Sequence, residues 1–304
     1  MTAKTKRTIK KYAFVYSLLL YPLILFAVFY VYININSILM AFQSISSSGE
    51  KTFVGFENFR DFFNRLQNPE LDPNLKTSLL NSVKLYFIGL IGHPIALFTA
   101  YYIFKKKALH RIYAFIVMIP DIVSIFVITI VFKKFIEGGL PSFMKTVFGV
   151  EDFPMLLVNK SYTFPTVVFF AIWSTMASAI LMQRASMGSI DASILESAHI
   201  DGVNYFQELW YIVFPMISGV IATGFITGIG GLFAASGPLV SFWMYSAPPE
   251  TWLTGYYMTQ RVMTNLEDPS GYALLSAMGL LFTAIIVPIT LLIKKLFDRI
   301  VPEV

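Results

Sequence analysis

The sequence contains no cysteine and few charged residues. None of its 304 residues is a cysteine, and only 13% are Asp, Glu, Lys or Arg, against 56% that are hydrophobic. The lack of cysteine excludes a disulfide framework, a thiolate metal site and a cysteine nucleophile. A soluble domain carries roughly 25% charged residues. The composition therefore excludes an ordinary water-soluble fold and predicts a membrane protein with several spans.

Six stretches are apolar enough to cross a bilayer, which takes about 20 residues each. The predicted spans cover residues 12–33, 81–104, 112–132, 164–183, 216–236 and 272–293. The first follows a basic stretch, as the apolar core of a signal peptide does, but it is too long and lacks a small-residue cleavage site. We therefore expect a retained helix and an all-α, polytopic membrane helix bundle of six transmembrane helices, forming a single domain over residues 1–304.

The few charges divide unevenly between the two ends of the spans. With the N-terminus in the cytoplasm, the cytoplasmic segments hold 13 of the 23 Lys and Arg but only six of the 18 Asp and Glu. Lys and Arg gather on the cytoplasmic side of membrane proteins. We therefore predict that both termini are cytoplasmic, and that the net charge of +5 reflects topology rather than binding of nucleic acid.

One predicted cytoplasmic loop, residues 184–215, does not follow this rule. It holds one arginine and no lysine, against Asp191, Glu196, Asp201 and Glu208. An amphipathic connector lying on the bilayer surface would carry basic residues on its polar face. The acidic loop therefore favours a docking surface for another protein over a lipid-bound connector.

The same loop predicts two short helices. Ser193 and Glu196 fit a capping box at the start of the first helix, and Asn204 with Gln207 fits a looser version at the start of the second. Gly202 tolerates the left-handed conformation in which helices often end. We therefore expect a sharp break at Gly202.

At this loop the sequence resembles the permease subunits of binding-protein-dependent ABC importers. Their E-A-A-x-x-D-G signature with a trailing I-x-x-P is matched at Glu196, Ala198, Asp201, Gly202, Gln207, Trp210, Ile212 and Pro215, while Ser197 replaces one of the two alanines. Elements of the carbohydrate branch are matched over residues 54–59, at Pro120 and Ser124, at Gly139 and Leu140, and at Trp173.

The resemblance implies a type I ABC importer permease, in which the loop 190–215, here called the coupling loop, joins the spans to a cytoplasmic ATPase subunit. The implied ATPase-coupling residues are Glu196, Ala198, Asp201, Gly202, Phe206 and Trp210. The implied partners are a second homologous permease subunit, expected in a heterodimer, two cytoplasmic ATPase subunits and an extracellular solute-binding protein, all at a bacterial plasma membrane. The chain has no G-x-x-x-x-G-K-[ST] motif, so we expect no cofactor and no enzyme activity in it, and ATP and Mg bound by the partner subunits.

The substrate path is harder to predict, because the fifth span lacks the polar side chains of better-known sugar permeases. Gly224 and Gly228 form a G-x-x-x-G face, which predicts close helix packing. The loop before the last span is rich in aromatic residues, which suit either an interfacial belt or the stacking of sugar rings. The residues that we expect to border the path are Trp173, Thr227, Trp252 and Tyr256.

The cargo expected from the resemblance is a carbohydrate, in particular an oligosaccharide, with a polyol, a glycerol phosphate or a peptide as alternatives. An ion-coupled secondary carrier is disfavoured because no internal repeat pairs the spans and deep ionisable groups are few. Lys84 is expected to snorkel to the outer interface rather than to contact substrate. His93 is expected to be a packed, hydrogen-bonded kink residue rather than a proton relay, and Asp121 to be structural rather than catalytic. A membrane enzyme would need convergent acids, histidines or metal ligands, which three scattered histidines do not provide.

Overall fold

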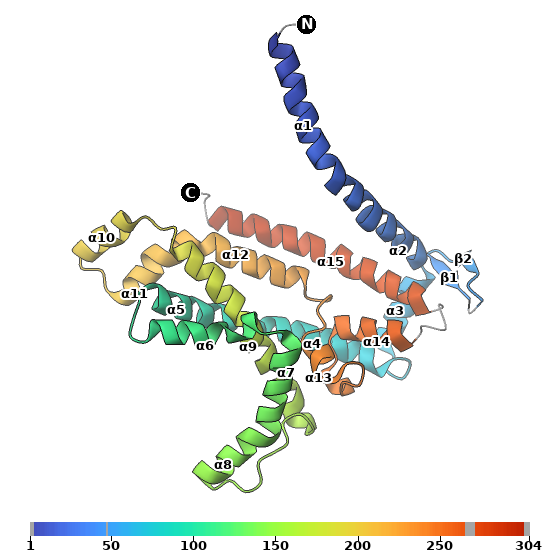
Figure 1. Ribbon diagram of the computed structural model, residues 1–304. Helices are drawn as coiled ribbons and strands as arrows, with labels where there is room; N and C mark the ends of the chain where they lie inside the picture. The colour runs from blue at the N-terminus through green and yellow to red at the C-terminus, as the bar shows by residue number, and fades with distance from the viewer. Residues whose placement is uncertain (1–2, 47, 265–270, 301–304) are drawn as a thin grey trace. The chain divides into compact units, whose positions relative to one another are not determined.

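The computed structural model describes residues 3–46, 48–264 and 271–300, and most of this chain is helical (Figure 1). A small antiparallel sheet joins β1 (Gln43–Ile45) to β2 (Lys51–Phe53), with Gln43 opposite Phe53. Helices satisfy their own backbone hydrogen bonds, which a segment in lipid requires. The predicted all-α class is confirmed. The side chains of the basic residues 4–11, and residues 301–304, lie outside the described part of the chain.

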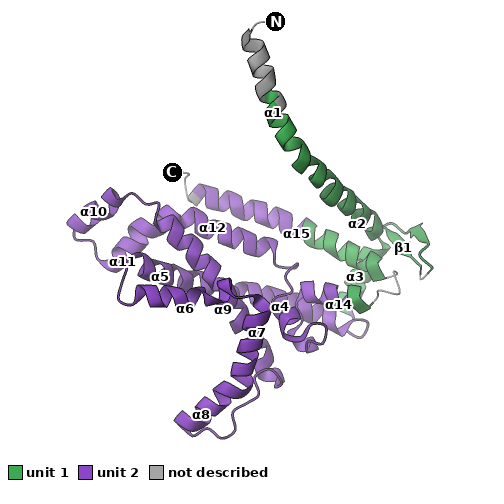
Figure 2. Cartoon of the chain, viewed as in Figure 1, with its two compact units in different colours: residues 1–67, 262–283 green, residues 68–261, 284–304 purple. Residues whose placement is uncertain are grey.

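The chain divides into two compact units, residues 1–67 with 262–283 and residues 68–261 with 284–304 (Figure 2). The helices of the first unit are α1 (Ala3–Leu25), the π-helical η1 (Phe26–Tyr32), α2 (Ile33–Ala41) and α3 (Glu57–Gln67), with parts of α14 (Thr254–Thr264) and α15 (Gly271–Ile300). In the first unit, Gly55 turns the chain with a φ of +61°, and the Asn58 amide donates to the carbonyl oxygens of Ala41 and Gln43, each at 2.9 Å. The element 54–59 thus fastens α3 to the end of α2.

The second unit holds the remaining elements. In chain order they are α4 (Pro73–Gly89), α5 (Gly92–Phe104), α6 (His110–Ile122), α7 (Ile125–Lys134), η2 (Phe135–Gly139), α8 (Leu140–Phe148), α9 (Lys160–Met187), α10 (Ala192–Ile200), α11 (Tyr205–Glu208), η3 (Leu209–Val213), α12 (Phe214–Gly230), α13 (Leu239–Trp243) and η4 (Pro249–Thr251). Its core lies where α5, α9 and α12 meet, and Ala96 and Ala100 are fully buried there. Small side chains at such a contact let helix backbones approach closely.

Five of the six predicted spans are continuous helical segments long enough to cross a membrane. They cover Phe14–Ala41, Pro73–Phe104, Lys160–Met187, Tyr205–Gly230 and Gly271–Arg299. Four of them extend beyond the predicted boundaries, because helices continue into polar flanking residues that the apolar pattern does not include. The span predicted over 216–236 instead ends at Gly230, where paired glycines permit the chain to leave the helix.

The third predicted span, residues 112–132, is wrong as a single straight helix. The structure breaks it into His110–Ile122 and Ile125–Phe148, which meet at 110°. Val123 and Ser124 are extended, with ψ of 139° and 136°, and so interrupt the helical ladder. Pro120, which cannot donate a backbone hydrogen bond, lies in the last turn before the break. Counting this bent pair as one span gives up to six.

Candidate functional site

The first helix of the coupling loop, α10, begins at Asp191 and not at Ser193. The Asp191 carboxylate accepts the backbone N–H of Ser193 at 2.9 Å and acts as the N-cap, so the predicted capping box of Ser193 with Glu196 is wrong. Aspartate caps a helix as well as serine does, and it comes two residues earlier. Hydrogen bonds from the backbone and side chain of Ser193 lower the pKa of this exposed carboxyl group.

The predicted break at Gly202 is confirmed. Gly202 has a φ of +76°. Its N–H donates to the carbonyl oxygen of His199, and the N–H of Val203 donates to the carbonyl oxygen of Ala198. This pair of bonds is the Schellman arrangement that closes a helix through a left-handed residue. A Cβ atom at position 202 would have no heavy atom within 4 Å. The backbone conformation, and not a lack of space within this chain, therefore requires glycine.

The second predicted short helix is the start of the fifth span. Asn204 caps it with a complete capping box: its side chain accepts the N–H groups of Phe206 and Gln207, and the Gln207 side chain accepts that of Asn204. From Tyr205 the helix continues through η3 into α12 as one 26-residue segment. A displacement of α11 is therefore transmitted directly to the span.

An ion pair with a buried carboxylate, which no pattern in the sequence indicates, holds α11 to the end of α5. The Lys105 ammonium donates to both carboxylate oxygens of Glu208, at 2.9 and 3.1 Å, and the Glu208 side chain is only 7% exposed. The hydroxyl group of Tyr101 donates to the Tyr205 carbonyl oxygen at 3.2 Å, and Lys107 lies over the Tyr205 ring. Glu208 is therefore an internal partner, which leaves three of the four loop acids for other contacts.

The remaining predicted coupling residues divide between the surface and the interior. Glu196, Asp201 and Phe206 are exposed, and Phe206 contacts the ring of Tyr205. Ala198 is buried, whereas Trp210 is 45% exposed and packs one side of its ring system on Phe98 and Phe214. Ile200, which was not among the predicted residues, is 85% exposed at the tip of α10. The exposed side chains of Glu196, Asp201, Ile200 and Phe206 thus lie on a loop whose two helices are capped.

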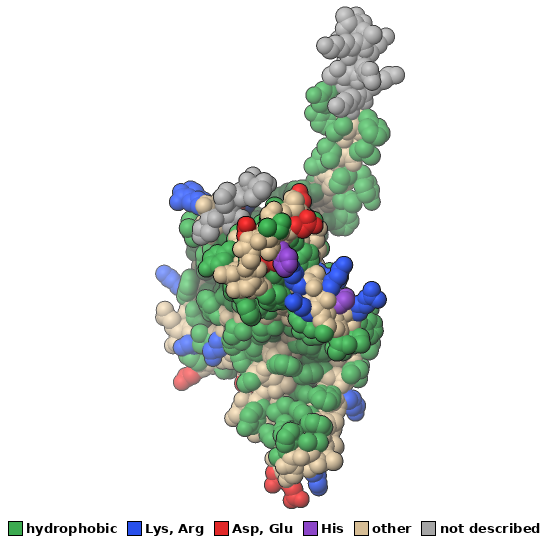
Figure 3. All heavy atoms as spheres, turned by 90° about the vertical axis from the view of Figure 1, so that its left-hand side faces the viewer, with side chains coloured by type: hydrophobic (Ala, Val, Ile, Leu, Met, Phe, Trp, Pro, Cys, Tyr) green, Lys and Arg blue, Asp and Glu red, His purple; other side chains and the backbone are tan. Residues whose placement is uncertain are grey.

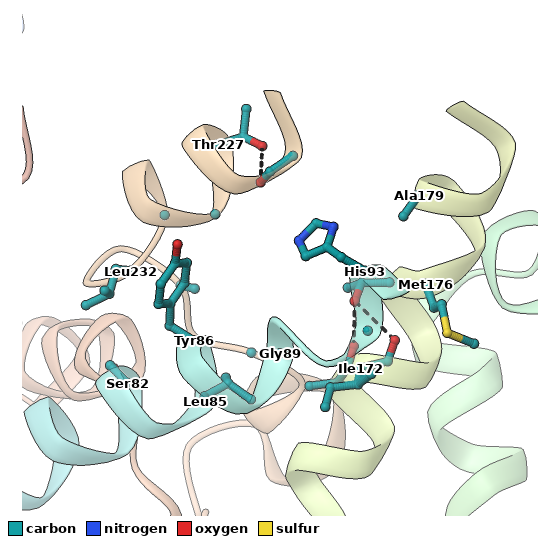
Figure 4. A pocket seen from close by; sticks show the side chains of 18 of the residues that line it. Ser82, Leu85, Tyr86, Gly89, His93, Ile172, Met176, Ala179, Thr227 and Leu232 are labelled. Carbon is teal, nitrogen blue, oxygen red and sulfur yellow. Dashed lines mark hydrogen bonds between the residues drawn. The ribbon is translucent and has the colours of Figure 1, made fainter. Parts of the chain in front are cut away.

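A cavity of about 520 Å³ lies between α4, α5, α9 and α12. Thr227, one of the predicted path residues, lines it, although its hydroxyl group already donates to the carbonyl oxygens of Thr223 and Gly224 (Figure 4). Tyr86 and His93 point into the same space from α4 and α5 (Figure 4). The cavity is therefore mainly apolar, with a phenol and an imidazole as its distinctive polar groups.

The two glycines of the G-x-x-x-G face make room for these rings. A Cβ atom on Gly224 would lie 3.0 Å from the His93 ring, and one on Gly228 would lie 3.2 Å from the Tyr86 ring. His93 also stacks on Phe225, with ring centroids 4.5 Å apart. The predicted close packing is present, but it sets α12 against aromatic side chains and not against another backbone.

The other predicted path residues are not among those that line this cavity. The indole N–H of Trp252 donates to the Ala247 carbonyl oxygen at 2.8 Å, and the N–H of Ala247 donates to the Tyr256 hydroxyl group at 3.0 Å. Trp173 packs on Phe132 and Phe170. Whether these three residues contact substrate stays a prediction.

The segment that carries Trp252 and Tyr256 is fixed to α4. Buried Asp72 caps α4 and accepts hydrogen bonds from the Tyr257 hydroxyl group at 2.6 Å and from the guanidinium group of Arg261. Burial, together with Asp72, raises the pKa of Tyr257, so this phenol stays a neutral donor. Gly255 is required here, because a Cβ atom would lie 2.2 Å from the backbone oxygen of Ala234.

Two of the ionisable residues at the spans, Asp121 and Lys84, differ in their surroundings. The Asp121 carboxylate accepts from the Ser178 hydroxyl group, which joins α6 to α9, and Lys84 is exposed. Within residues 3–46, 48–264 and 271–300, no three His, Asp or Glu side chains lie close enough together to hold a metal ion.

Comparison with known protein families gives a match over residues 73–304. The matching family is described as "Binding-protein-dependent transport system inner membrane component". The match covers the coupling loop, the cavity and every element from α4 onward.

Individual proteins are also similar to this chain. The arabinooligosaccharides transport system permease protein AraP of Halalkalibacterium halodurans is 28% identical over 81% of this chain and 78% of its own length. The sn-glycerol-3-phosphate transport system permease protein UgpA of Pectobacterium atrosepticum is 24% identical over 81% of this chain and 82% of its own length.

A solved structure shares the fold. It is a bacterial alginate ABC transporter in complex with an alginate pentasaccharide-bound periplasmic protein, and one of its chains matches with a TM-score of 0.80. The match covers 98% of each chain at 20% identity. The helical bundle predicted from the sequence is therefore confirmed.

Proposed function

Because the chain belongs to the family of binding-protein-dependent transport system inner membrane components, we propose that it is a permease subunit of an ATP-driven carbohydrate importer. In this proposal the cargo is an oligosaccharide. The chain lines half of the translocation pathway, and a second, different permease subunit lines the other half. Two cytoplasmic ATPase subunits bind ATP and Mg, and an extracellular solute-binding protein delivers the sugar.

The observation that carries the coupling role is the shape of residues 191–215. The helix α10 presents Glu196, Asp201 and Ile200 outward. Its Gly202 turn leads into a helix that is continuous with the fifth span. A partner that moves α10 would therefore move the span that lines the cavity, and this linkage suits the coupling of ATP hydrolysis to transport.

The chemistry of the cavity favours a neutral sugar over a phosphate ester. UgpA belongs to a transport system for sn-glycerol 3-phosphate, so this anion is the second candidate cargo. Within the described chain, the residues that line the cavity include no Lys or Arg, and a buried phosphate without a cation is costly. Apolar walls with a few polar groups suit the C–H faces and hydroxyl groups of a sugar, as the likeness to AraP also suggests.

We place the coupling loop and both chain termini in the cytoplasm of a bacterial cell, with the chain in the plasma membrane. The distribution of Lys and Arg supports this orientation, because the basic segments 105–111 and 294–299 would then lie on the same side as the loop.

The test is reconstitution of the complete complex in vesicles with its binding protein. ATP hydrolysis and uptake should be stimulated by oligosaccharides presented through the binding protein, with arabino-oligosaccharides as the first panel. Glycerol 3-phosphate serves as the matched non-sugar cargo. Vesicles without ATP should take up neither compound.

Two results would contradict the proposal. Stimulation by glycerol 3-phosphate and by none of the sugars would overturn the cargo. Uptake by the chain alone, driven by a proton or sodium gradient, would overturn the ATP-driven mechanism.

A further inference from the structure

A second cavity, of about 550 Å³, opens between α5 and α6 on the side of the coupling loop. Its walls are mainly apolar, from Phe98, Ile112 and Ile116, and these three side chains are exposed by 40% or more. The cavity is separate from the one that contains His93, since the two share no lining residue. It is therefore distinct from the cavity that we assign to the cargo.

Basic residues are sequence neighbours of residues that line this cavity, although the described lining itself includes no Lys or Arg. The loop between α5 and α6 and the first turn of α6 carry Lys105, Lys106, Lys107 and Arg111 within seven residues. Figure 3 shows Lys and Arg side chains gathered on the face of the molecule that contains this end of the helices. Lys105 is engaged by Glu208 and Lys107 by the ring of Tyr205. Lys106 and Arg111 are exposed and remain available to an anion.

The backbone of the loop holds these cations in a fixed arrangement. Lys106 has a φ of +49° and Leu109 a φ of +57°, both in the left-handed region that non-glycine residues rarely adopt. The Tyr102 hydroxyl group donates to the Ala108 carbonyl oxygen at 2.6 Å and closes the turn. The basic residues therefore belong to a turn that is closed by a hydrogen bond from Tyr102, a residue of the cavity wall.

The lining of the cavity also includes a pair of hydroxyl groups. The hydroxyl groups of Thr99 and Tyr113 lie 3.3 Å apart and form one hydrogen bond between them. Whichever oxygen accepts, its own proton is free to be donated to a ligand. The lining thus combines a pair of hydroxyl groups with apolar side chains, next to a loop that carries exposed cations.

We propose that this cavity binds an anionic phospholipid, with its phosphate at Lys106 and Arg111, its ester region at the Thr99–Tyr113 pair and an acyl chain along Phe98, Ile112 and Ile116. The apolar wall favours a lipid over free phosphate, and the exposed cations favour an anionic headgroup over a neutral one. Basic pockets between membrane helices on the cytoplasmic side suit such headgroups. The side assignment rests on the proposed function.

The site also bears on coupling. The turn that holds Lys106 also carries Lys105 and Lys107, which fasten α11 through Glu208 and Tyr205. A lipid phosphate on Lys106 and Arg111 stabilises this turn, and so supports the frame that positions α11. Transport by the complex should therefore depend on anionic lipid.

The experiment uses the purified permease complex in nanodiscs that contain phosphatidylcholine and phosphatidylglycerol, each with a photoreactive acyl chain. We expect phosphatidylglycerol to label α5 and α6 in preference to phosphatidylcholine, and inorganic phosphate not to compete. Lys106→Gln with Arg111→Gln should weaken phosphatidylglycerol binding by roughly 30-fold, because each cation near an anionic lipid contributes about fivefold. Ile116→Trp should fill the cavity and reduce labelling as well.

Matched controls are Lys294→Gln with Lys295→Gln, which removes the same charge at the end of α15, and Ile130→Trp, which adds a ring at an exposed position of α7. Neither should change the labelling of α5 and α6. Equal labelling by both lipids, an unaffected double variant, or crosslinks from this cavity to a second permease subunit would overturn the lipid site.

The lipid measurement needs no ATP hydrolysis, so it is independent of the transport assay. Selective labelling in a complex that imports no sugar would contradict the proposed function and support the lipid site. Sugar import without lipid selectivity would support the proposed function and overturn the lipid site.

Discussion

Gly202 determines the direction of the coupling loop through its backbone alone. Its φ of +76° lies in the left-handed region, while a Cβ atom at this position would meet only open space within this chain. A side chain at this residue therefore affects either the turn itself or a surface of the ATPase subunit. Substitutions that separate these two effects test the coupling role directly.

Gly202→Val should reduce sugar-stimulated ATP hydrolysis strongly, because a non-glycine residue in this conformation costs about 1–2 kcal/mol and a β-branched one is the least suited. Gly202→Asn should keep most of the activity, since asparagine adopts the left-handed conformation more readily. Both should still bind the solute-binding protein. Equal loss of hydrolysis in the two variants would show that the ATPase surface, and not the turn, requires glycine.

At the scale of elements, the coupling loop is held by α5 and not by its own helices. The pair of Lys105 and Glu208 joins the end of α5 to α11, and the hydrogen bond from Tyr101 to Tyr205 lies beside it. Glu208 carries the same type of side chain as the exposed acids of the loop, so the sequence does not indicate that Glu208 alone is paired inside the chain. The burial of its side chain makes the pair structural.

Lys105→Met should destabilise the complex by about 3 kcal/mol, because it leaves the buried Glu208 carboxylate without its cation. Lys105→Met combined with Glu208→Met should restore much of that stability. Thermal unfolding of the purified complex measures both. Arg65→Met removes a pair with Asp61 in which neither side chain is fully buried, at 32% and 39% exposed. It is the matched control and should cost at most about 0.5 kcal/mol. An additive loss in the double variant would contradict the role of the pair.

At the scale of the whole molecule, the lack of cysteine gives a direct test of topology. Every introduced cysteine is the only thiol in the chain. Ser142 in α8 and Lys295 near the end of α15 are both exposed, and the predicted orientation puts them on opposite sides of the membrane. Because the orientation rests on charge distribution alone, this experiment decides it.

Ser142→Cys should react with an impermeant maleimide in right-side-out vesicles, and Lys295→Cys only in inside-out vesicles. Leu97→Cys, at a buried position, should react in neither and reports background labelling of inaccessible thiols. Labelling of Lys295→Cys from the outside would reverse the proposed orientation, and with it the cytoplasmic position of the coupling loop.

Much of the architecture follows from the sequence because it depends on local properties. Hydropathy alone locates five spans, and the type I importer fold inferred at residues 196–215 is confirmed by the family match and the shared fold. Gly202 was predictable because a left-handed helix end is a property of one residue. The cap at Asn204 was equally local, since it depends on neighbours three residues apart.

The remaining features depend on residues far apart in the chain, which come together only when the chain folds. Lys105 and Glu208 are 103 positions apart, and Gly255 meets the backbone of Ala234 only after the segment folds back. The break at Val123 depends on extended backbone angles that a uniformly apolar stretch does not reveal. Composition and local patterns were enough to predict a membrane environment, the number of spans to within one, and the turn at Gly202. The packing of α5, α9, α11 and α12 determined which polar groups are buried, because burial depends on contacts that no local pattern encodes.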